Sequence, residues 1–315
     1  MTGSPSSLPS IDSVLLIGFG GPTRPEEIVP FLQRVTAGRG VPDSRLAEVL
    51  HHYEVVGGRS PYNEQTQSLA DAVQAWLSGQ GRTLPVRIGL RHWGPSLTDI
   101  VGSMAAGGLR HAAGVILAAH RSEASWERYM RDVETALAAA APSMRVTYLA
   151  PWFDDPDFLE SVARRVEEAS GYRRGAWPPE VPLIFTAHSI PESMARASPY
   201  VADLMRSCEG AARLLKPGTW RLAYQSRSGN PREPWLEPDI LEVLRECGRQ
   251  GRAEVVVQAI GFLSDHVEVL FDLDVEARQV AGCLGIKMTR AACVGAHPLF
   301  AAMLGRRVLA LGDTV

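Results

Sequence analysis

The sequence has no long apolar run and no excess of basic charge, and these two absences exclude whole classes of protein. Its longest apolar stretches, residues 115–119 and 136–141, fall far short of the roughly 20 residues that a membrane-spanning helix needs. The formal net charge is -3, from 32 basic and 35 acidic side chains, which leaves no surplus to neutralise a phosphate backbone. We therefore expect no integral membrane contact and no nucleic-acid partner.

Cysteine is scarce, and a secretory leader is not visible. The spacing of the cysteines fits neither a disulfide framework nor a metal-ligand motif, so we expect buried free thiols. Residues 1–13 are rich in serine and proline and lack a basic segment followed by an apolar one, so we expect a cytoplasmic protein. The four cysteines are Cys208, Cys247, Cys283 and Cys293.

Short apolar runs alternate with longer amphipathic segments, which is typical of strand and helix units around a parallel sheet. The runs are continuously apolar, so helices should cover both faces of each sheet. Eight such runs in 315 residues favour two four-stranded doubly wound domains, although a closed barrel stays open as an alternative. The predicted strands are 14–18, 86–90, 114–119, 146–150, 182–187, 221–225, 255–260 and 286–289.

A stretch without periodicity, residues 170–182, divides the chain. Its glycine, arginine and proline content is typical of a linker. We therefore predict an N-terminal α/β domain over residues 1–170 and a C-terminal one over 171–296, with a final helix within 297–315 that could pack back on the first domain. The other predicted helices are 25–35, 65–77, 97–105, 125–140, 156–169, 201–215, 240–249 and 266–285.

Histidines gather just after the predicted strands, where open α/β sheets bind their ligands. Four of the eight lie there: His92, His120, His188 and His266. A single histidine at such a position more often makes a structural hydrogen bond, but the coincidence favours a shared site. His188 is the strongest candidate because it ends a wholly apolar strand and would meet solvent only in a cleft.

Three acidic residues, Glu268, Asp272 and Glu276, recur every four positions in a predicted helix and so share one face. A solvated helix face is the usual explanation for such a row. Glu268, however, directly follows the strand-end loop and could face the same cleft as His188. A carboxylate opposite an imidazole suits a divalent metal such as Fe2+, or proton transfer near neutral pH.

The glycines of residues 18–21 do not make a nucleotide site. The pattern of a dinucleotide-binding turn is incomplete, and Pro22 interrupts the expected start of its helix.

Six long segments carry a family resemblance that runs nearly from end to end of the chain. They are LLIGFGGPTRPEEIVPFLQRVTAGRGVP, HYEVVGGRSPYNEQ, FTAHSIPESM, YQSRSGNPREPWLEPDI, IGFLSDHVEVLFDLDVEA and HPLF. On these the sequence resembles the ferrochelatases, most closely the coproporphyrin ferrochelatases of the coproporphyrin-dependent haem route. The resemblance implies two similar Rossmann-like domains, each with a four-stranded parallel sheet, around a porphyrin cleft.

The resemblance also implies a reaction, insertion of Fe2+ into a porphyrin with release of two pyrrole protons and without an organic cofactor. It places the metal-site histidine on His188 and its carboxylate partner on Glu268. Asp272 and Glu276 would then lead protons or cations away. Whether His188 ligates the metal or accepts a proton stays open.

Porphyrin-contacting positions of the family match Ser60, Tyr53 and Tyr129, and also His52 and Arg39. Their hydroxyl and cationic donors suit propionate carboxylates. Phe19 stands where some relatives have a tyrosine that can ligate the iron, which phenylalanine cannot do.

The polar character of residues 38–52 favours coproporphyrin III, because this stretch lacks the apolar lip of membrane-associated protoporphyrin enzymes. Protoporphyrin IX is the alternative within the same class. A non-catalytic tetrapyrrole or haem carrier is the alternative of a different class, and the presence of both His188 and Glu268 argues against it.

Many relatives carry a [2Fe-2S] cluster, held by a cysteine near the segment that here reads SEASW (residues 122–126) and by others in a C-terminal extension. This sequence has neither, so we expect no cluster. The route itself implies a downstream enzyme that processes the coproheme product.

Overall fold

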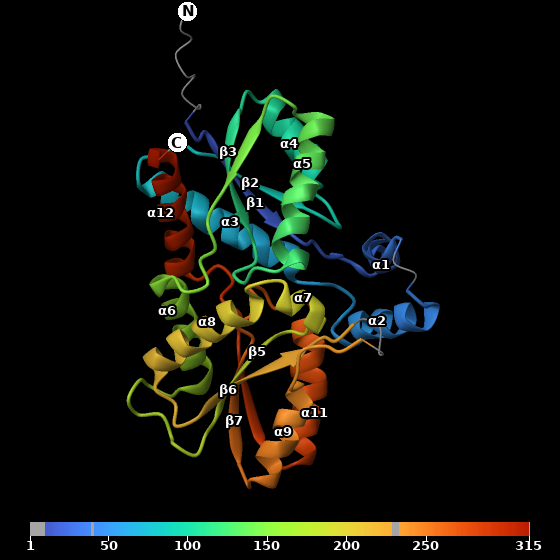
Figure 1. Cartoon of the computed structure of the whole chain (residues 1–315), viewed down its shortest axis with the longest axis vertical. Helices are drawn as coiled ribbons and strands as arrows, with labels where there is room; N and C mark the ends of the chain where they lie inside the picture. The colour runs from blue at the N-terminus through green and yellow to red at the C-terminus, as the bar shows by residue number, and fades with distance from the viewer. Residues whose placement is uncertain (1–9, 39–40, 229–232, 315) are drawn as a thin grey trace, which may run out of the picture.

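Two four-stranded parallel sheets form the framework of the molecule. The computed structural model describes residues 10–38, 41–228 and 233–314. The strand orders are β2-β1-β3-β4 and β6-β5-β7-β8 (Figure 1), which confirms two similar doubly wound α/β units. The strands are β1 (Ser13–Gly18), β2 (Val86–Leu90), β3 (His111–Ile116), β4 (Arg145–Tyr148), β5 (Leu183–His188), β6 (Trp220–Gln225), β7 (Glu254–Gln258) and β8 (Lys287–Ala291).

Helices cover both faces of the first sheet, as the continuous apolar strands predict. Leu15 and Ile17 of β1 pack with the residues of α4 and α5, whereas Val14 and Leu16 face α3 and α12. Each side chain of β1 therefore enters one of two cores. These helices are α3 (Tyr62–Gly79), α4 (Leu97–Ala106), α5 (Arg128–Ala140), which a π-turn η2 (Glu123–Glu127) precedes, and α12 (Pro298–Thr314).

The second sheet is covered in the same way. Phe185 packs against the side of α6 and α8, whereas Ile184 packs against α9, α11 and the π-helix η3. The helices of this half are α6 (Pro156–Ser170), α7 (Glu192–Arg196), α8 (Tyr200–Leu215), α9 (Ile240–Arg249), α10 (Val267–Val269), η3 (Leu270–Ala277) and α11 (Arg278–Cys283).

Side-chain caps fix several helix starts. Ser96 accepts a hydrogen bond from the Asp99 N–H at the start of α4, and Asp155 accepts one from the Asp157 N–H at the start of α6. Pro25 opens the short 3-10 helix η1 (Pro25–Glu27), which leads into α1 (Ile28–Thr36).

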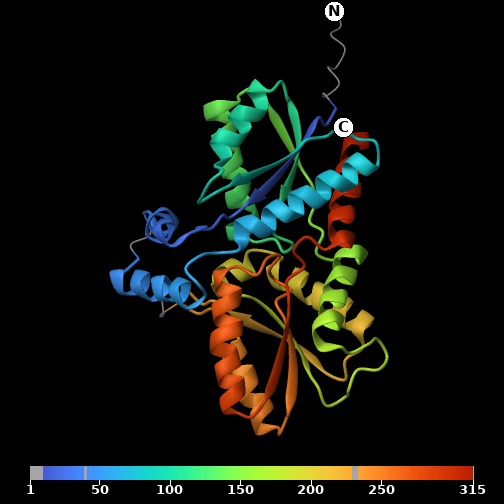
Figure 2. The same ribbon diagram turned by 180° about the vertical axis from the view of Figure 1, so that it is seen from behind.

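Three helical segments differ from the sequence prediction, and one of them is the short α7, which was not predicted. The helix α2 (Asp43–Val55) was not predicted, because its sequence is mostly polar and only Tyr53 is fully buried. The single helix predicted over residues 266–285 is instead α10, η3 and α11 in succession, and η3 has the wider i to i+5 turns of a π-helix. Helices α1 and α2 extend from one side of the molecule in both views (Figures 1 and 2).

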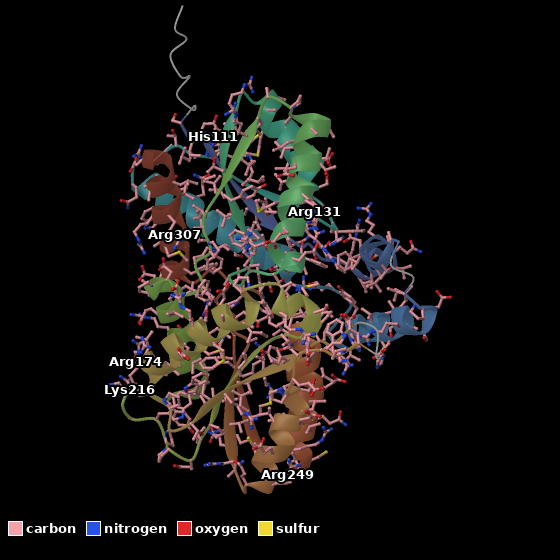
Figure 3. All side chains as sticks on the ribbon, viewed as in Figure 1. His111, Arg131, Arg174, Lys216, Arg249 and Arg307 are labelled. Atoms are coloured by element: carbon pink, nitrogen blue, oxygen red, sulfur yellow. The ribbon has the colours of Figure 1, made fainter. Side chains whose placement is uncertain are left out.

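The C-terminal helix α12 lies against α3 of the first half and against α6, as Figure 2 shows from behind. Phe300 of α12 packs against Trp152 and Phe158, with ring centroids 5.1 and 6.0 Å away. Arg307 of α12, labelled in Figure 3, donates a hydrogen bond to Asp155 at 3.1 Å. Helix α6 also packs against β7, β8 and α8, so the contacts of residues 156–170 lie mainly with the second sheet. The division of the chain at residue 170 stays a prediction.

No helix in the described ranges is both long enough and apolar enough to cross a membrane. Val29 on α1 and Val55 on α2 are exposed apolar side chains. Val55 lies just beyond the polar stretch 38–52.

Candidate functional site

His188 is the last residue of β5, where the sequence analysis placed its strongest candidate. The preceding residues of the strand are buried, whereas 29% of the His188 side chain is exposed. Its Nδ1 contacts the Ser189 carbonyl, and the Tyr200 hydroxyl donates to the His188 carbonyl at 2.9 Å. Because a carbonyl oxygen only accepts, Nδ1 carries the proton of the neutral ring and Nε2 keeps the lone pair.

Glu268 faces this lone pair from the other side of the site. Its Oε1 lies 3.8 Å from His188 Nε2, and its Oε2 lies 3.9 Å from Nδ1 of His266. His266 caps the helix that begins there, since its Nδ1 accepts the Glu268 N–H at 3.2 Å. Two imidazoles and one carboxylate therefore meet between the ends of β5 and β7.

The charges of this pair support each other. Burial alone would raise the pKa of Glu268, but the proximity of His188 outweighs burial and lowers that pKa to about 2. Burial also opposes a charged His188, yet Glu268 holds the pKa of His188 above its ordinary value. The pKa of His266 is lowered, because it is buried beside the positive charge of His188. Glu268 is thus an anion at neutral pH. Of the two imidazoles, His188 has the higher pKa and accepts a proton more readily than His266.

Asp272 follows Glu268 by four residues, on the π-helix η3. It is buried and accepts hydrogen bonds from Gln225 Nε2 at 3.3 Å and from the Ser226 hydroxyl. Burial, with Glu268 and Glu276 nearby, raises the pKa of Asp272 to about 7. Glu276 is exposed. The row of three carboxylates predicted from the sequence therefore runs from the site through a buried group to solvent.

The glycine-rich turn after β1 makes room for an aromatic side chain, not for a nucleotide. A Cβ atom on Gly18 would lie 2.6 Å from the Tyr62 hydroxyl, and that hydroxyl accepts the Phe19 N–H at 2.8 Å. Gly20 has a φ of +89°, which favours glycine. Phe19 is thereby presented at the end of the first sheet, where it packs against His92 with ring centroids 4.6 Å apart.

Ser60 and Tyr129 are buried at the same end of the first sheet. The Ser60 N–H donates to the Pro22 carbonyl at 2.8 Å, which holds Ser60 beside the glycine turn. The Arg91 guanidinium lies over the Tyr129 ring, 4.7 Å from its centroid, and is paired with Asp132. Burial raises the pKa of Tyr129, so its hydroxyl keeps its proton and can donate.

Helix α2 joins the two groups of residues. Its His52 stacks on Phe271 of η3 with ring centroids 3.6 Å apart, and its Tyr53 belongs to a buried cluster with Phe31 and Val267. The structure therefore brings His52 and Tyr53 beside α10 and η3, the segment that carries Glu268. Arg39 lies outside the described residues.

Not every histidine after a strand belongs to the site. His120 is buried against α8, where its Nε2 lies 2.9 Å from the Ser207 hydroxyl oxygen, and burial lowers its pKa to about 3. It is a structural residue between the two halves. His111, on β3, lies far from the junction of the two halves (Figure 3).

Sequence reasoning missed several residues that support the site. Tyr62, Arg91, Gln225 and Ser226 were given no role, although the last three lie at predicted strand ends, and Tyr62, Gln225 and Ser226 lie in segments that carry the family resemblance. Tyr62 follows no strand, and its contact with Phe19 depends on tertiary structure.

The described residues do not form a ready-made metal cage. Within the described ranges no group of three or more histidine, cysteine, aspartate or glutamate side chains is arranged to hold a metal ion. All four cysteines are free, as predicted. Three of them are buried, but Cys283, the last residue of α11, is exposed, so the prediction of burial is wrong for Cys283.

Comparisons with known proteins agree with this architecture. The family model described as ferrochelatase matches residues 12–310. A coproporphyrin III ferrochelatase of Frankia alni is 42% identical over 308 residues, which cover 94% of this chain and 78% of that protein. A ferrochelatase of Rhodopirellula baltica is 39% identical, over 95% of this chain and 86% of that one. Among solved structures, SirB from Bacillus subtilis with Fe3+ superposes with a TM-score of 0.62 at 12% identity, over 96% of each chain, which shows the fold alone.

Proposed function

The chain belongs to the ferrochelatase family, and from this premise we propose that it inserts Fe2+ into coproporphyrin III to form coproheme. The balance of the reaction is one Fe2+ in and two pyrrole protons out. The observation that supports this most is the facing pair of His188 and Glu268, a proton acceptor and an anion 3.8 Å apart at the carboxyl ends of two strands.

In this proposal His188 removes the pyrrole protons and Glu268 binds the incoming metal ion. The lone pair of His188 Nε2 accepts the two pyrrole protons one after the other and releases the first before it takes the second; the imidazolium that forms each time is stabilised by Glu268. Glu268 keeps its negative charge at neutral pH and makes the first contact with Fe2+. In this proposal both residues touch the metal site, and Fe2+ is a substrate that leaves with the product.

Asp272 and Glu276 form the exit for protons. A carboxyl group with a pKa of about 7 can both take and release a proton near neutral pH, which suits Asp272 to relay protons from His188 and Glu268. Glu276 is exposed and passes the charge to solvent.

The porphyrin lies between the two groups of residues. Hydroxyl groups for binding the propionates come from Ser60, Tyr53 and Tyr129. The imidazole ring of His52, on α2 like Tyr53, lies against Phe271. Arg39 is assigned to the same task from the family resemblance alone. Phe19 contacts the macrocycle face without ligating iron. The site accelerates insertion if it binds a distorted macrocycle better than a flat one.

Coproporphyrin III is proposed over protoporphyrin IX for two reasons. The relative from Frankia alni is named for coproporphyrin III, and residues 38–52 are polar. The relative from Rhodopirellula baltica is named only as a ferrochelatase, so protoporphyrin IX is the competing substrate in the test. A tetrapyrrole carrier is the third candidate.

We propose that the protein works without an organic cofactor and without a [2Fe-2S] cluster, and that it passes coproheme to a downstream processing enzyme. Stoichiometric iron and labile sulfide in the purified protein would show that a [2Fe-2S] cluster is present. The cytoplasmic location expected from the sequence stays a prediction.

The experiment is an anaerobic optical assay of the purified protein with Fe2+ and each porphyrin in turn. The proposal predicts faster metallation of coproporphyrin III. Faster metallation of protoporphyrin IX would show that protoporphyrin IX is the preferred substrate. Tight binding of a porphyrin without metallation of either one would favour the interpretation as a tetrapyrrole carrier.

A further inference from the structure

The π-helix η3 is fastened to both edges of the second sheet. In the order β6-β5-β7-β8, strands β6 and β8 are the two edges. At the β6 edge Asp272 accepts hydrogen bonds from Gln225 and Ser226. At the β8 edge Arg290 holds Asp274. Rotation of η3 about its axis would break one set of bonds or the other.

Arg290 makes three directed bonds with two carboxylates. Its Nε and Nη2 donate to the two oxygens of Asp274 at 2.8 and 2.7 Å, and its Nη1 donates to Asp265 Oδ1 at 2.6 Å. A guanidinium is a rigid planar fork, so a bidentate contact fixes direction as well as distance. Only 12% of the Arg290 side chain is exposed, so solvent and salt screen these pairs little.

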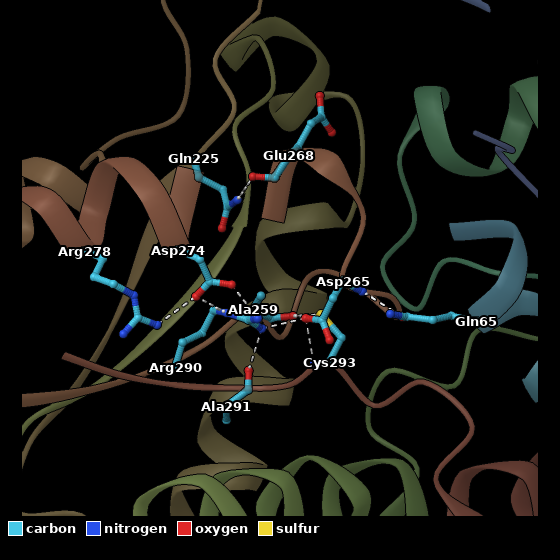
Figure 4. Close-up of polar contacts among 10 residues, drawn as sticks. All are labelled: Gln65, Gln225, Ala259, Asp265, Glu268, Asp274, Arg278, Arg290, Ala291 and Cys293. Carbon is cyan, nitrogen blue, oxygen red and sulfur yellow. Dashed lines mark hydrogen bonds and ion pairs between the residues drawn. The ribbon is translucent and has the colours of Figure 1, made fainter. Parts of the chain in front are cut away.

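Asp265 is anchored to the first half of the molecule as well. Its N–H donates to Gln65 Oε1 of α3 at 2.9 Å, and its Oδ1 accepts the Cys293 N–H at 3.2 Å (Figure 4). Asp265 precedes Glu268 in the chain and Asp274 follows Asp272. Arg290 therefore joins the two ends of the segment that carries both carboxylates of the site.

We propose that Arg290 is a positioning residue for iron insertion, which holds Asp265 and Asp274 so that Glu268 faces His188 and Asp272 faces Ser226. The inference rests on the proposed function for its chemistry, but its geometry is independent of the substrate. Arg290 itself is assigned no contact with Fe2+ or porphyrin.

The test compares Arg290→Ala with Arg278→Ala in the full chain. Arg278 donates to the same Asp274 carboxylate at 3.0 Å, but its side chain is 55% exposed, which makes it a matched control. In Arg290→Ala we expect kcat to fall about tenfold or more, while the Kd for coproporphyrin III stays within about threefold. Arg278→Ala should keep kcat within about twofold.

Chemical rescue separates positioning from loss of folded protein. Guanidinium ion at millimolar concentration should restore part of kcat in Arg290→Ala and none in Glu268→Gln. An unchanged kcat, an equal loss in Arg278→Ala, or a loss without rescue would overturn the inference. If Arg290→Ala does not fold, Asp274→Asn replaces it in the test, because asparagine keeps the shape of the aspartate side chain. The same loss of kcat without a change in Kd is then expected. An unchanged kcat in Asp274→Asn would contradict the inference.

Hydrogen exchange of residues 264–277, measured without substrate, keeps this inference apart from the proposed function. Faster exchange in Arg290→Ala than in Arg278→Ala supports the positioning role even if the wild type does not metallate coproporphyrin III, a result that would defeat the proposed function alone. Equal exchange in the two variants would defeat the positioning role.

Discussion

His188 Nε2 and Glu268 Oε1 lie 3.8 Å apart, brought together from the ends of β5 and β7, two neighbouring strands of one parallel sheet. Hydrogen bonds support both residues: Nδ1 of His188 contacts the Ser189 carbonyl, and the Glu268 N–H donates to Nδ1 of His266. The first contact orients the His188 ring, and the second fixes the backbone from which the Glu268 side chain extends, which favours pre-organisation for proton transfer.

Glu268→Gln should lower turnover about a hundredfold or more, because the neutral amide lacks the negative charge that stabilises an imidazolium and a metal cation. Porphyrin binding, measured by fluorescence quenching, should change little. Glu54→Gln is the control, since Glu54 lies on α2 with 64% of its side chain exposed. A variant with wild-type turnover would remove Glu268 from the mechanism.

Asp272→Asn should alter the pH dependence of stability in a defined direction. The folded pKa of Asp272 is raised to about 7 from 3.8, so the folded state holds a proton that the unfolded chain releases. The native carboxyl therefore stabilises the fold at low pH, and that stability is lost as pH rises through about 7. Relative to wild type, the variant should gain about 2 kcal/mol of unfolding free energy between pH 5 and pH 8. Denaturant unfolding at the two pH values measures this; parallel curves for the two proteins would show that Asp272 does not titrate there.

His120→Gln should flatten the acid side of the stability profile. Burial lowers the pKa of His120 to about 3, so its neutral form contributes stability above the unfolded value of 6.5, and this stability is lost as pH falls toward 3. Wild type should lose up to about 1.4 kcal/mol per pH unit from this group below pH 6. The variant should lack that slope in urea unfolding. If the variant keeps the same slope of unfolding free energy against pH, titratable groups other than His120 cause that slope.

Gly18→Ala and Tyr62→Phe should be strongly coupled. The alanine Cβ would lie 2.6 Å from the Tyr62 hydroxyl, so Gly18→Ala alone forces a displacement. Tyr62→Phe removes that oxygen and makes room, at a cost of about 1 to 2 kcal/mol for the unpaired Phe19 N–H. In a double-mutant cycle of unfolding free energies, the double variant should be less destabilised than the sum of the single variants, by about 1 kcal/mol. Simple additivity would contradict the contact.

The sequence predicts the strands well, for a physical reason. Strands buried on both faces must be continuously apolar, and ligands gather at their carboxyl ends, so local patterns select His188 and Glu268 as candidates, whose roles stay predictions. Strand β3 begins earlier than predicted, at His111, because histidine and alanine carry little strand signal.

Features that depend on distant partners were not predictable. Helix α2 has a polar sequence and is held by Tyr53, whose cluster includes Val267 from the other half. The π-helix η3 has the same carboxylate spacing that an α-helix would show, so the spacing does not distinguish them. Arg290 lies on the strand with the weakest pattern, and its partners precede it in the chain by many residues.

The most direct measurement is the anaerobic conversion of coproporphyrin III by Fe2+, followed by its absorption spectrum, in wild type and in His188→Ala. The account predicts conversion to the iron porphyrin by the wild type, and bound but unconverted porphyrin in the variant. Conversion at equal rates in both proteins would contradict the central role of His188.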